Sequence, residues 1–123
     1  MKINDPQVLA EVSAAFQRYQ TAIIENDLAV LNELFWDDPL TLRYGIGENL
    51  YGHAAIAGYR SARDPASLAR VETKRVVTTY GEDYATTNIE FTRQGKLGRQ
   101  SQAWARMPEG WRIVAAHVSY LQA

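Results

Sequence analysis

Arg43 is the side chain in this sequence whose position most suggests chemistry. It lies in the strand-forming run Thr41 to Ile46 and shares the parity of Thr41 and Gly45, which separates it from the bulky residues alternating with it. A guanidinium on an inward face needs a carboxylate or another anion beside it, because an unpaired buried charge is costly. Arg43 is therefore a candidate for binding a carboxylate bidentately. The alternative is a surface arginine on a half-exposed strand.

Tyr19 is a candidate partner for Arg43. It falls on the apolar stripe of a long amphipathic helix that begins at Asp5-Pro6. A phenol facing a pocket can donate a hydrogen bond to a carbonyl oxygen on which negative charge builds up, or relay a proton. The alternative is a core tyrosine whose hydroxyl reaches any buried acceptor.

Four further polar side chains are candidate substrate-binding residues. If the last two strands turn the relevant faces inward, Gln102 would offer an amide and Ser119 a hydroxyl to a urea-like ligand; for Gln102 the alternative is an outward polar residue. Tyr44 follows Arg43 directly. His117 is of the type most often used as a general base, and a structural histidine at a strand end or dimer contact is the alternative. Alternation groups five residues of the last strand on one face: Trp111, Ile113, Ala115, His117 and Ser119.

The sequence offers little for other chemistries. It has no cysteine, which excludes thiol catalysis, disulfides and zinc–thiolate sites. His53 and His117 are far apart and no acidic cluster accompanies them, so we expect no metal site and no cofactor.

Glu48 falls in a hairpin turn, where a solvated charge is usual and a place at a pocket rim is the alternative. Arg60 and Arg63 end a helix, where cations offset the helix dipole without a ligand.

The composition is that of an ordinary globular chain, with 46% apolar residues, 22% charged residues and a formal net charge of −1. A length of 123 residues suits a single domain over 1–123. The 13 Lys and Arg residues are dispersed, so we expect no nucleic-acid partner. The N-terminus lacks the apolar core of a signal peptide and no apolar run approaches the roughly 20 residues of a membrane span, so we expect no membrane partner and a cytoplasmic location.

The periodicity of apolar residues changes from about 3.6 to 2 near residue 70, which predicts an α+β fold. Short turns make neighbouring strands antiparallel. We expect helices packed on one face of a strongly curved antiparallel sheet, leaving a concave pocket. The expected helices run from Asp5-Pro6 to Asn26-Asp27, over 28–35 and over 53–63; a hairpin joins 41–46 to 49–51; and the later strands cover 70–80, 84–93, 99–107 and 111–121.

Several local strings resemble the AtzH-like family, whose members include the HpxZ-type proteins of oxalurate catabolism. The family lies within the SnoaL-like, or nuclear transport factor two-like (cystatin-like), superfamily, and the resemblance extends over nearly the whole chain. The strings are Phe16-x-x-Tyr19, Asn26-Asp27, Leu34-Phe35-Trp36, Thr41-x-Arg43-Tyr44-Gly45, Glu48-Asn49-Leu50-Tyr51-Gly52, Gly98-Arg99-Gln100-Ser101-Gln102 and Trp111 to Ser119.

The resemblance implies a cone-shaped fold with about three N-terminal helices on the curved sheet. It also implies a role beside amidases in ureido-acid, purine and allantoin nitrogen metabolism. One member is described as a decarboxylating amidohydrolase acting on 1,3-dicarboxyurea, with an essential Tyr on the first helix and an essential Arg on the first strand. These positions correspond to Tyr19 and Arg43, and no cofactor is implied.

Three functional interpretations follow from the residues and the resemblance. The first is a hydrolase acting on a small carboxylated ureido compound. The second is a non-catalytic module that binds such a compound or assists an amidase. The third is a structural homodimer with a vestigial pocket, paired through a sheet face that carries Trp104 and Trp111. A homodimer is expected under all three.

Overall fold

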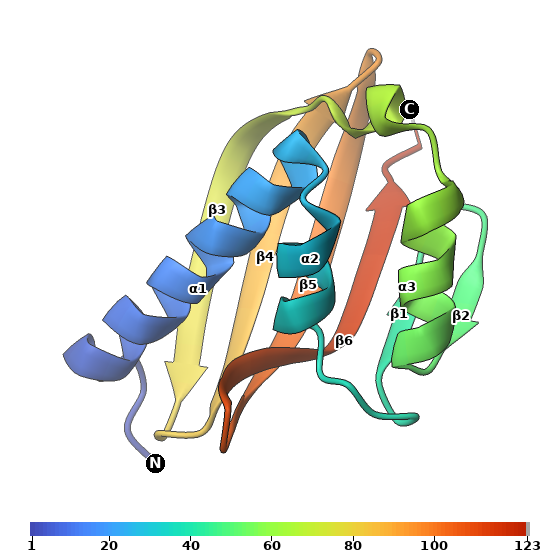
Figure 1. The fold of residues 1–123 in the computed structure, drawn as a ribbon. Coiled ribbons are helices and arrows are strands. Elements are labelled where there is room, and N and C mark those ends of the chain that lie inside the picture. Colours follow the sequence, from blue (N-terminus) through green and yellow to red (C-terminus); the bar gives the residue numbers. More distant parts are fainter. Residues whose placement is uncertain (123) are drawn as a thin grey trace.

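The computed structural model describes residues 1–122, with Ser67 described by its backbone only. Three α-helices lie on one face of a six-stranded sheet (Figure 1). None of the described helices is both long and apolar enough to cross a membrane. The elements are α1 (Pro6–Glu25), α2 (Leu28–Leu34), β1 (Leu42–Tyr44), β2 (Asn49–Tyr51), α3 (His53–Ala62), the 3₁₀ helix η1 (Pro65–Leu68), β3 (Val71–Tyr80), β4 (Tyr84–Arg93), β5 (Lys96–Met107) and β6 (Gly110–Tyr120).

The first two helices begin and end where the sequence predicts. The Asp5 carboxylate accepts a hydrogen bond from the backbone N–H of Val8 at 3.3 Å, which caps α1. Asn26 ends the helix in the left-handed conformation, at a φ of 54°, and its backbone N–H donates to the carbonyl of Ala22. Asp27 then caps α2 by accepting from the N–H of Val30 at 3.2 Å. The chain therefore reverses direction between the two helices on local signals alone.

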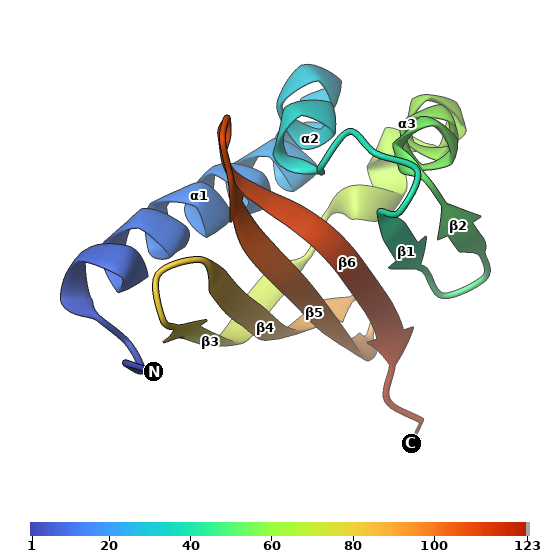
Figure 2. The same ribbon diagram turned by 90° about the horizontal axis from the view of Figure 1, so that it is seen from below.

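The sheet has the strand order β2-β1-β6-β5-β4-β3, and the expected antiparallel meander of β3 to β6 is confirmed. The expectation of a wholly antiparallel sheet is wrong at one pair, because β1 joins β6 in parallel, with Leu42 opposite Ala115 and Tyr44 opposite His117. Short turns determine only the pairing of consecutive strands, and β1 and β6 are far apart in the sequence. Figure 2 shows the twisted strands beneath the helices, with the β1–β2 hairpin at one side.

The turn between β4 and β5 is tighter than the sequence suggested. Gln94 and Gly95 both have positive φ values, 52° and 77°, which is the geometry of a two-residue hairpin turn. Strand β5 therefore begins at Lys96 instead of Arg99.

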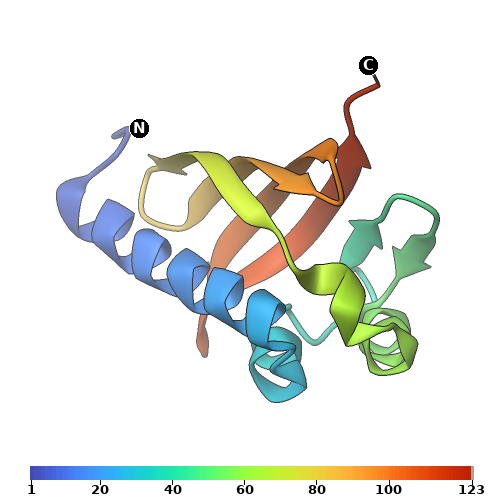
Figure 3. The same cartoon turned by 90° about the horizontal axis from the view of Figure 1, so that it is seen from above.

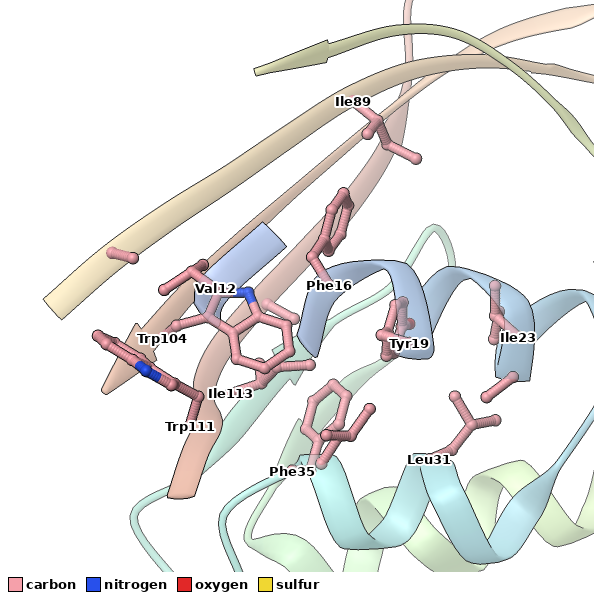
Figure 4. Packing of buried hydrophobic residues seen from close by; sticks show 14 of the residues in the cluster. Val12, Phe16, Tyr19, Ile23, Leu31, Phe35, Ile89, Trp104, Trp111 and Ile113 are labelled. Carbon is pink, nitrogen blue, oxygen red and sulfur yellow. The ribbon is translucent and has the colours of Figure 1, made fainter. Parts of the chain in front are cut away.

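The core lies between α1, α2 and the inner face of the sheet. Phe16 and Tyr19 of α1 meet Phe35, Trp104 and Ile113 there (Figure 4). Their burial is the main favourable contribution to folding, at roughly 25 cal/mol per Å² of apolar surface.

Trp104 and Trp111 belong to this core and not to a self-association surface. Their exposed fractions are 0% and 7%. The indole N–H of Trp104 donates to the Thr87 hydroxyl at 3.0 Å, and that of Trp111 donates to the Glu11 carboxylate at 3.1 Å. The expectation that these tryptophans present a dimerisation surface is therefore wrong, because the inner strand faces pack against α1 within the same chain.

Candidate functional site

A cavity of about 210 Å³ lies beside Tyr19, between α1, α3, the β1–β2 hairpin and the sheet. In Figure 3 the β1–β2 hairpin, α3 and η1 lie together on one side of the molecule. Four guanidinium groups and one carboxylate give its lining side chains a formal charge of +3. The charged lining residues are Arg43, Arg63, Arg70, Arg93 and Glu48; the others are Tyr19, Tyr59, Gln100, Gly47, Ile23, Ile46, Leu68 and Val118.

Arg43 turns inward from β1 and meets a carboxylate from its own hairpin. Its Nη1 lies 2.9 Å from Oε1 of Glu48, and both side chains are mostly buried, with 12% and 21% exposed. The guanidinium also lies over the ring of Tyr59, with Cζ 5.5 Å from the ring centroid. Gly45 leaves room for the pair, since a Cβ there would lie 1.8 Å from Oε1 of Glu48. The hairpin thus presents a held arginine at the cavity rim.

The acid and the phenol beside Arg43 respond to this environment. Burial raises the pKa of the Glu48 carboxyl, but hydrogen bonds from Arg43 and Tyr59 outweigh burial and hold that pKa below its ordinary value. Burial and the hydrogen bond to Glu48 raise the pKa of Tyr59. At neutral pH the rim therefore holds a carboxylate, a guanidinium and a neutral phenol.

Arg63 carries the clearest unfilled hydrogen-bonding capacity in the cavity. Its Nε and Nη2 are buried and have no hydrogen-bond partner among the described residues. Burial lowers the pKa of Arg63, Tyr19 opposes this effect, and the charge of Arg43 lowers the pKa further. Buried donors of a charged group are costly to leave unpaired, so this side chain favours an acceptor-rich, anionic ligand.

Arg70 and Arg93 approach the cavity from the opposite wall. Their Cζ atoms lie 4.6 Å and 5.7 Å from the centroid of the Phe91 ring, so one aromatic ring supports both cations. Nε of Arg93 donates to the hydroxyl of Tyr120 at 2.8 Å. Burial lowers the pKa of Arg70, and repulsion from other cavity arginines, first Arg93, adds to that effect. The positive charges therefore lie close enough to repel one another.

Tyr19 lies at the boundary between this cavity and the core. It is 4% exposed, and its ring lies 6.4 Å from that of Phe16 and 6.1 Å from that of Phe35, centroid to centroid (Figure 4). Behind it, Arg60 is 2% exposed and stacks over Phe35 at 4.2 Å. Burial lowers the pKa of Arg60 to about 10, and its interaction with Tyr19 acts in the opposite direction. A buried cation beside the phenol can stabilise negative charge that develops there.

The structure brings Tyr19 and Arg43 together in one cavity but places Tyr44 and His117 elsewhere. Those two side chains lie on the outer face of the sheet, where their rings meet edge to face with centroids 5.8 Å apart. They line an open apolar groove of about 340 Å³ on that face.

Ser119 also faces away from the cavity, because β6 contains a bulge. The register with β5 shifts between the pairs Trp104–Ile113 and Ala103–Ala115, so Val114 is the extra residue. An extra residue inverts the alternation beyond it. Trp111 and Ile113 therefore face the core, whereas His117 and Ser119 face outward, and the Ser119 hydroxyl accepts from Arg99 at 3.3 Å.

Gln102 points inward but belongs to the core network. It is 2% exposed and its Oε1 accepts from the Thr87 hydroxyl at 3.1 Å. It does not line the arginine cavity, which is reached instead by Gln100, two residues earlier on the same strand face.

Arg70 and Arg93 line the cavity although the sequence analysis did not single them out, and Arg63 lines it although it was interpreted as a helix-ending cation without a ligand. A signal was available for Arg93, which follows Ile89 and Phe91 at two-residue steps along the inner face of β4. Arg63 follows Ile56 at a helical step of seven residues. Arg70 precedes β3 and carries no comparable signal.

Among residues 1–122 no group of three His, Asp or Glu side chains is arranged to hold a metal ion. The donors that surround the cavity are guanidinium, phenol and amide groups, which suit an anion.

Comparison with known proteins places this chain in a family. The sequence matches the AtzH-like family over residues 1–123. The chain belongs to the AtzH-like family. No protein with a curated description matches it.

Solved structures agree with this family assignment. This AtzH-like chain is similar to a protein of unknown function from Pectobacterium atrosepticum. The two sequences are 56% identical, the TM-score is 0.95, and the match covers 98% of this chain and 95% of that one. It is also similar to a cystatin-like fold protein from Burkholderia xenovorans, with 46% identity, a TM-score of 0.94 and coverage of 100% and 98%.

A more distant structure shows the fold alone. A nuclear transport factor 2-like superfamily protein from Salmonella enterica has 24% identity and a TM-score of 0.78, with coverage of 95% of this chain and 93% of that one. The AtzH-like chain therefore has the α+β cone of the cystatin-like and nuclear transport factor 2-like proteins.

Proposed function

We propose that this protein binds and processes a small carboxylated ureido compound, of the oxalurate or 1,3-dicarboxyurea type, as a cofactor-free decarboxylating amidohydrolase of ureido-acid catabolism. The observation that carries the proposal is the excess of guanidinium groups in the cavity, above all the buried and unpartnered Nε and Nη2 of Arg63. Such a cluster is costly without an anion and becomes favourable when one binds.

The size of the cavity favours a compact ligand. Its volume of about 210 Å³ equals that of roughly seven water molecules in the liquid. A planar ureido acid carries carboxylate and carbonyl oxygens within this volume, and guanidinium groups bind such oxygens in pairs.

Tyr19 and Arg43 have distinct roles in the proposed reaction. Arg43, held by Glu48 at 2.9 Å, grips a carboxylate at the rim together with the arginines of the opposite wall. Tyr19 donates a hydrogen bond to the carbonyl oxygen on which negative charge develops, with Arg60 behind it. Positioning and charge stabilisation are thus supplied by residues of this chain.

The second candidate function is a binding or amidase-accessory protein without catalysis. The observation that favours it is the composition of the described lining, which includes no Ser, Thr, Cys or His, and whose one carboxylate is already paired with Arg43. For the protein to be an enzyme instead, its nucleophile or general base would have to be water or Tyr19.

A homodimer is part of both candidates. Helices cover one face of the sheet (Figure 2). The groove beside Tyr44 and His117 lies on the other face. Sedimentation equilibrium of the purified protein tests this expectation, and a monomer at all concentrations would remove the dimer from the proposal.

The deciding experiment combines calorimetric titration with assays of ammonia and carbon dioxide release, using oxalurate, allophanate and 1,3-dicarboxyurea. Turnover supports the enzyme and identifies the bond that is broken, whereas binding without release supports the accessory function. Tyr19→Phe should lower turnover by roughly 100-fold while retaining most of the affinity. Arg43→Ala should lower both turnover and affinity. If none of the three compounds binds to the wild-type protein, the proposal is contradicted.

A further inference from the structure

Two buried glutamines connect the cavity to an ion pair on β3. Nη1 of Arg70 donates to Oε1 of Gln100 at 3.5 Å, and Nε2 of Gln100 donates to Oε1 of Gln20 at 3.3 Å. Nε2 of Gln20 donates in turn to Oε1 of Glu72 at 3.1 Å. Gln20 and Gln100 are 4% and 2% exposed. Glu72 itself accepts two hydrogen bonds of 2.7 Å from Arg75.

A bulge in β3 makes this connection available. Residues three apart on a regular strand face opposite sides, but the register of β3 with β4 shifts between Glu72 and Lys74, which leaves Thr73 unpaired. Glu72 and Arg75 therefore share one side of the strand. The carboxylate is held there by Arg75, and together burial and hydrogen bonds leave its pKa below the ordinary value, the bond from Arg75 being the main cause.

The chain of hydrogen bonds has a direction set by its two ends. A carboxylate only accepts and a guanidinium only donates. Each amide between them must therefore turn its NH2 group toward Glu72 and its carbonyl toward Arg70, because reversing either glutamine would set donor against donor or acceptor against acceptor. The carboxylate of Glu72 and the guanidinium of Arg70 thus favour the same direction, and the carboxylate reinforces the presentation of the Gln100 carbonyl to Arg70.

We propose that Glu72, through Gln20 and Gln100, is a positioning residue that orients Arg70 toward the anion in the cavity. The proposal rests on the proposed function, because it assigns Arg70 the same carboxylated ligand. Nε of Arg70 is fixed by the carbonyl of Leu68 at 3.2 Å, and Nη1 by Gln100, while Phe91 supports its plane. With two of three nitrogens held, the guanidinium meets its ligand in one orientation.

The test moves the negative charge from position 72 to position 20 within this series of hydrogen bonds. Glu72→Gln removes the charge, so the direction of the two amides is set by Arg70 alone and they are held less firmly. In the double variant with Gln20→Glu, the new carboxylate accepts from both Gln100 and the amide at position 72, which restores a negatively charged acceptor that holds Gln100. Glu90→Gln is the matched control, because Glu90 is an exposed residue of β4 that takes no part in the chain.

Affinity for oxalurate is the first readout. Glu72→Gln should weaken binding about 3- to 30-fold, the range usual for residues that act through others. The double variant should recover the wild-type affinity, and Glu90→Gln should leave it unchanged. Equal affinity in Glu72→Gln and wild type, or a double variant as weak as Glu72→Gln, would overturn the proposal.

The Nε–H NMR signal of Arg70 in the ligand-free protein is the second readout. It should move in Glu72→Gln and return in the double variant, whether or not oxalurate binds. If wild type fails to bind oxalurate, the proposed ligand is wrong while this signal still decides the positioning role. An unmoved signal in Glu72→Gln overturns that role.

Discussion

The pair formed by Arg43 and Glu48 determines how the rim of the cavity is presented to a ligand. Glu48 holds one edge of the guanidinium at 2.9 Å and leaves the rest of the arginine available at the cavity. The same contact keeps the carboxylate ionised at neutral pH, because hydrogen bonds outweigh the effect of burial on its pKa. Arg43 is therefore both oriented and partly neutralised before any ligand arrives.

Glu48→Gln should show this coupling as a pH-dependent loss of stability. A carboxyl group whose pKa is lowered on folding stabilises the protein above its unfolded pKa, and this contribution disappears as the pH falls through the folded pKa. At pH 7 we expect the free energy of unfolding to fall by about 1 to 2 kcal/mol. Urea unfolding over a pH series measures it. A difference from wild type that persists unchanged below the folded pKa would contradict this account.

Two glycines in the same hairpin offer a matched comparison. A Cβ at Gly45 would lie 1.8 Å from Oε1 of Glu48 and 2.9 Å from Nη1 of Arg43, whereas a Cβ at Gly47 would meet nothing within 4 Å. Gly45→Ala should therefore destabilise the protein by about 1 to 3 kcal/mol. Gly47→Ala should change stability little, and urea unfolding of both variants separates the two cases. Equal effects would show that the ion pair has room to move.

At the scale of the elements, bulges in β3 and β6 decide which side chains reach the inner face. Val114 turns His117 and Ser119 outward, and Thr73 brings Glu72 to the side of Arg75. Each bulge adds a single unpaired residue to an otherwise regular ladder. The composition of the inner face is therefore set by strand pairing as much as by alternation.

The pairing of β4 with β5 should be sensitive to one methyl group. Gly98 lies opposite Phe91, and a Cβ there would lie 2.3 Å from Cζ of that ring, which supports Arg70 and Arg93. Gly98→Ala should lower the free energy of unfolding by about 1 to 3 kcal/mol and weaken oxalurate binding. Thermal unfolding and calorimetric titration measure the two effects.

The control for this change lies in α3. A Cβ at Gly58 would meet nothing within 4 Å, so Gly58→Ala should stabilise the helix by about 0.5 to 1 kcal/mol. Destabilisation by Gly58→Ala, or none by Gly98→Ala, would contradict this account of the packing.

At the scale of the whole molecule, charge is distributed unevenly. The chain has a formal net charge of −1, yet the cavity lining carries +3. Burial, and after it repulsion from other arginines, lowers the pKa of Arg63 and of Arg70, so holding these charges in the ligand-free protein costs stability. Binding of an anion should therefore raise the free energy of unfolding, because any ligand specific for the native state stabilises that state.

Arg63→Met should therefore make the ligand-free protein more stable and weaken its binding of the ligand. Removing a buried charge with unpartnered donors should stabilise the ligand-free protein by about 1 kcal/mol and abolish the thermal shift produced by oxalurate. Arg99→Met, on the exposed side of β5, is the control and should retain the shift. Thermal unfolding with and without oxalurate measures both effects. A less stable Arg63→Met protein would mean that Arg63 has a structural partner.

The sequence by itself determined most of the elements and the residues that share a strand face with Arg43, whereas the structure decided that this face turns inward. Asp5 and Asn26 predict the ends of the first helix because capping depends on neighbouring backbone groups only. The parity of Arg43 with Thr41 and Gly45 correctly separated it from Leu42 and Tyr44, since no bulge interrupts that short strand.

Only the tertiary structure decided which side chains share a cavity. The parallel pairing of β1 with β6 joins segments about 70 residues apart, and no local pattern records such a contact. The bulge at Val114 inverts the face of His117 and Ser119, and it falls within the apolar run from Ile113 to Ala116, where alternation alone does not identify the extra residue. Arg63, Arg70 and Arg93 converge although their charges repel, because the packing of the whole chain offsets that cost.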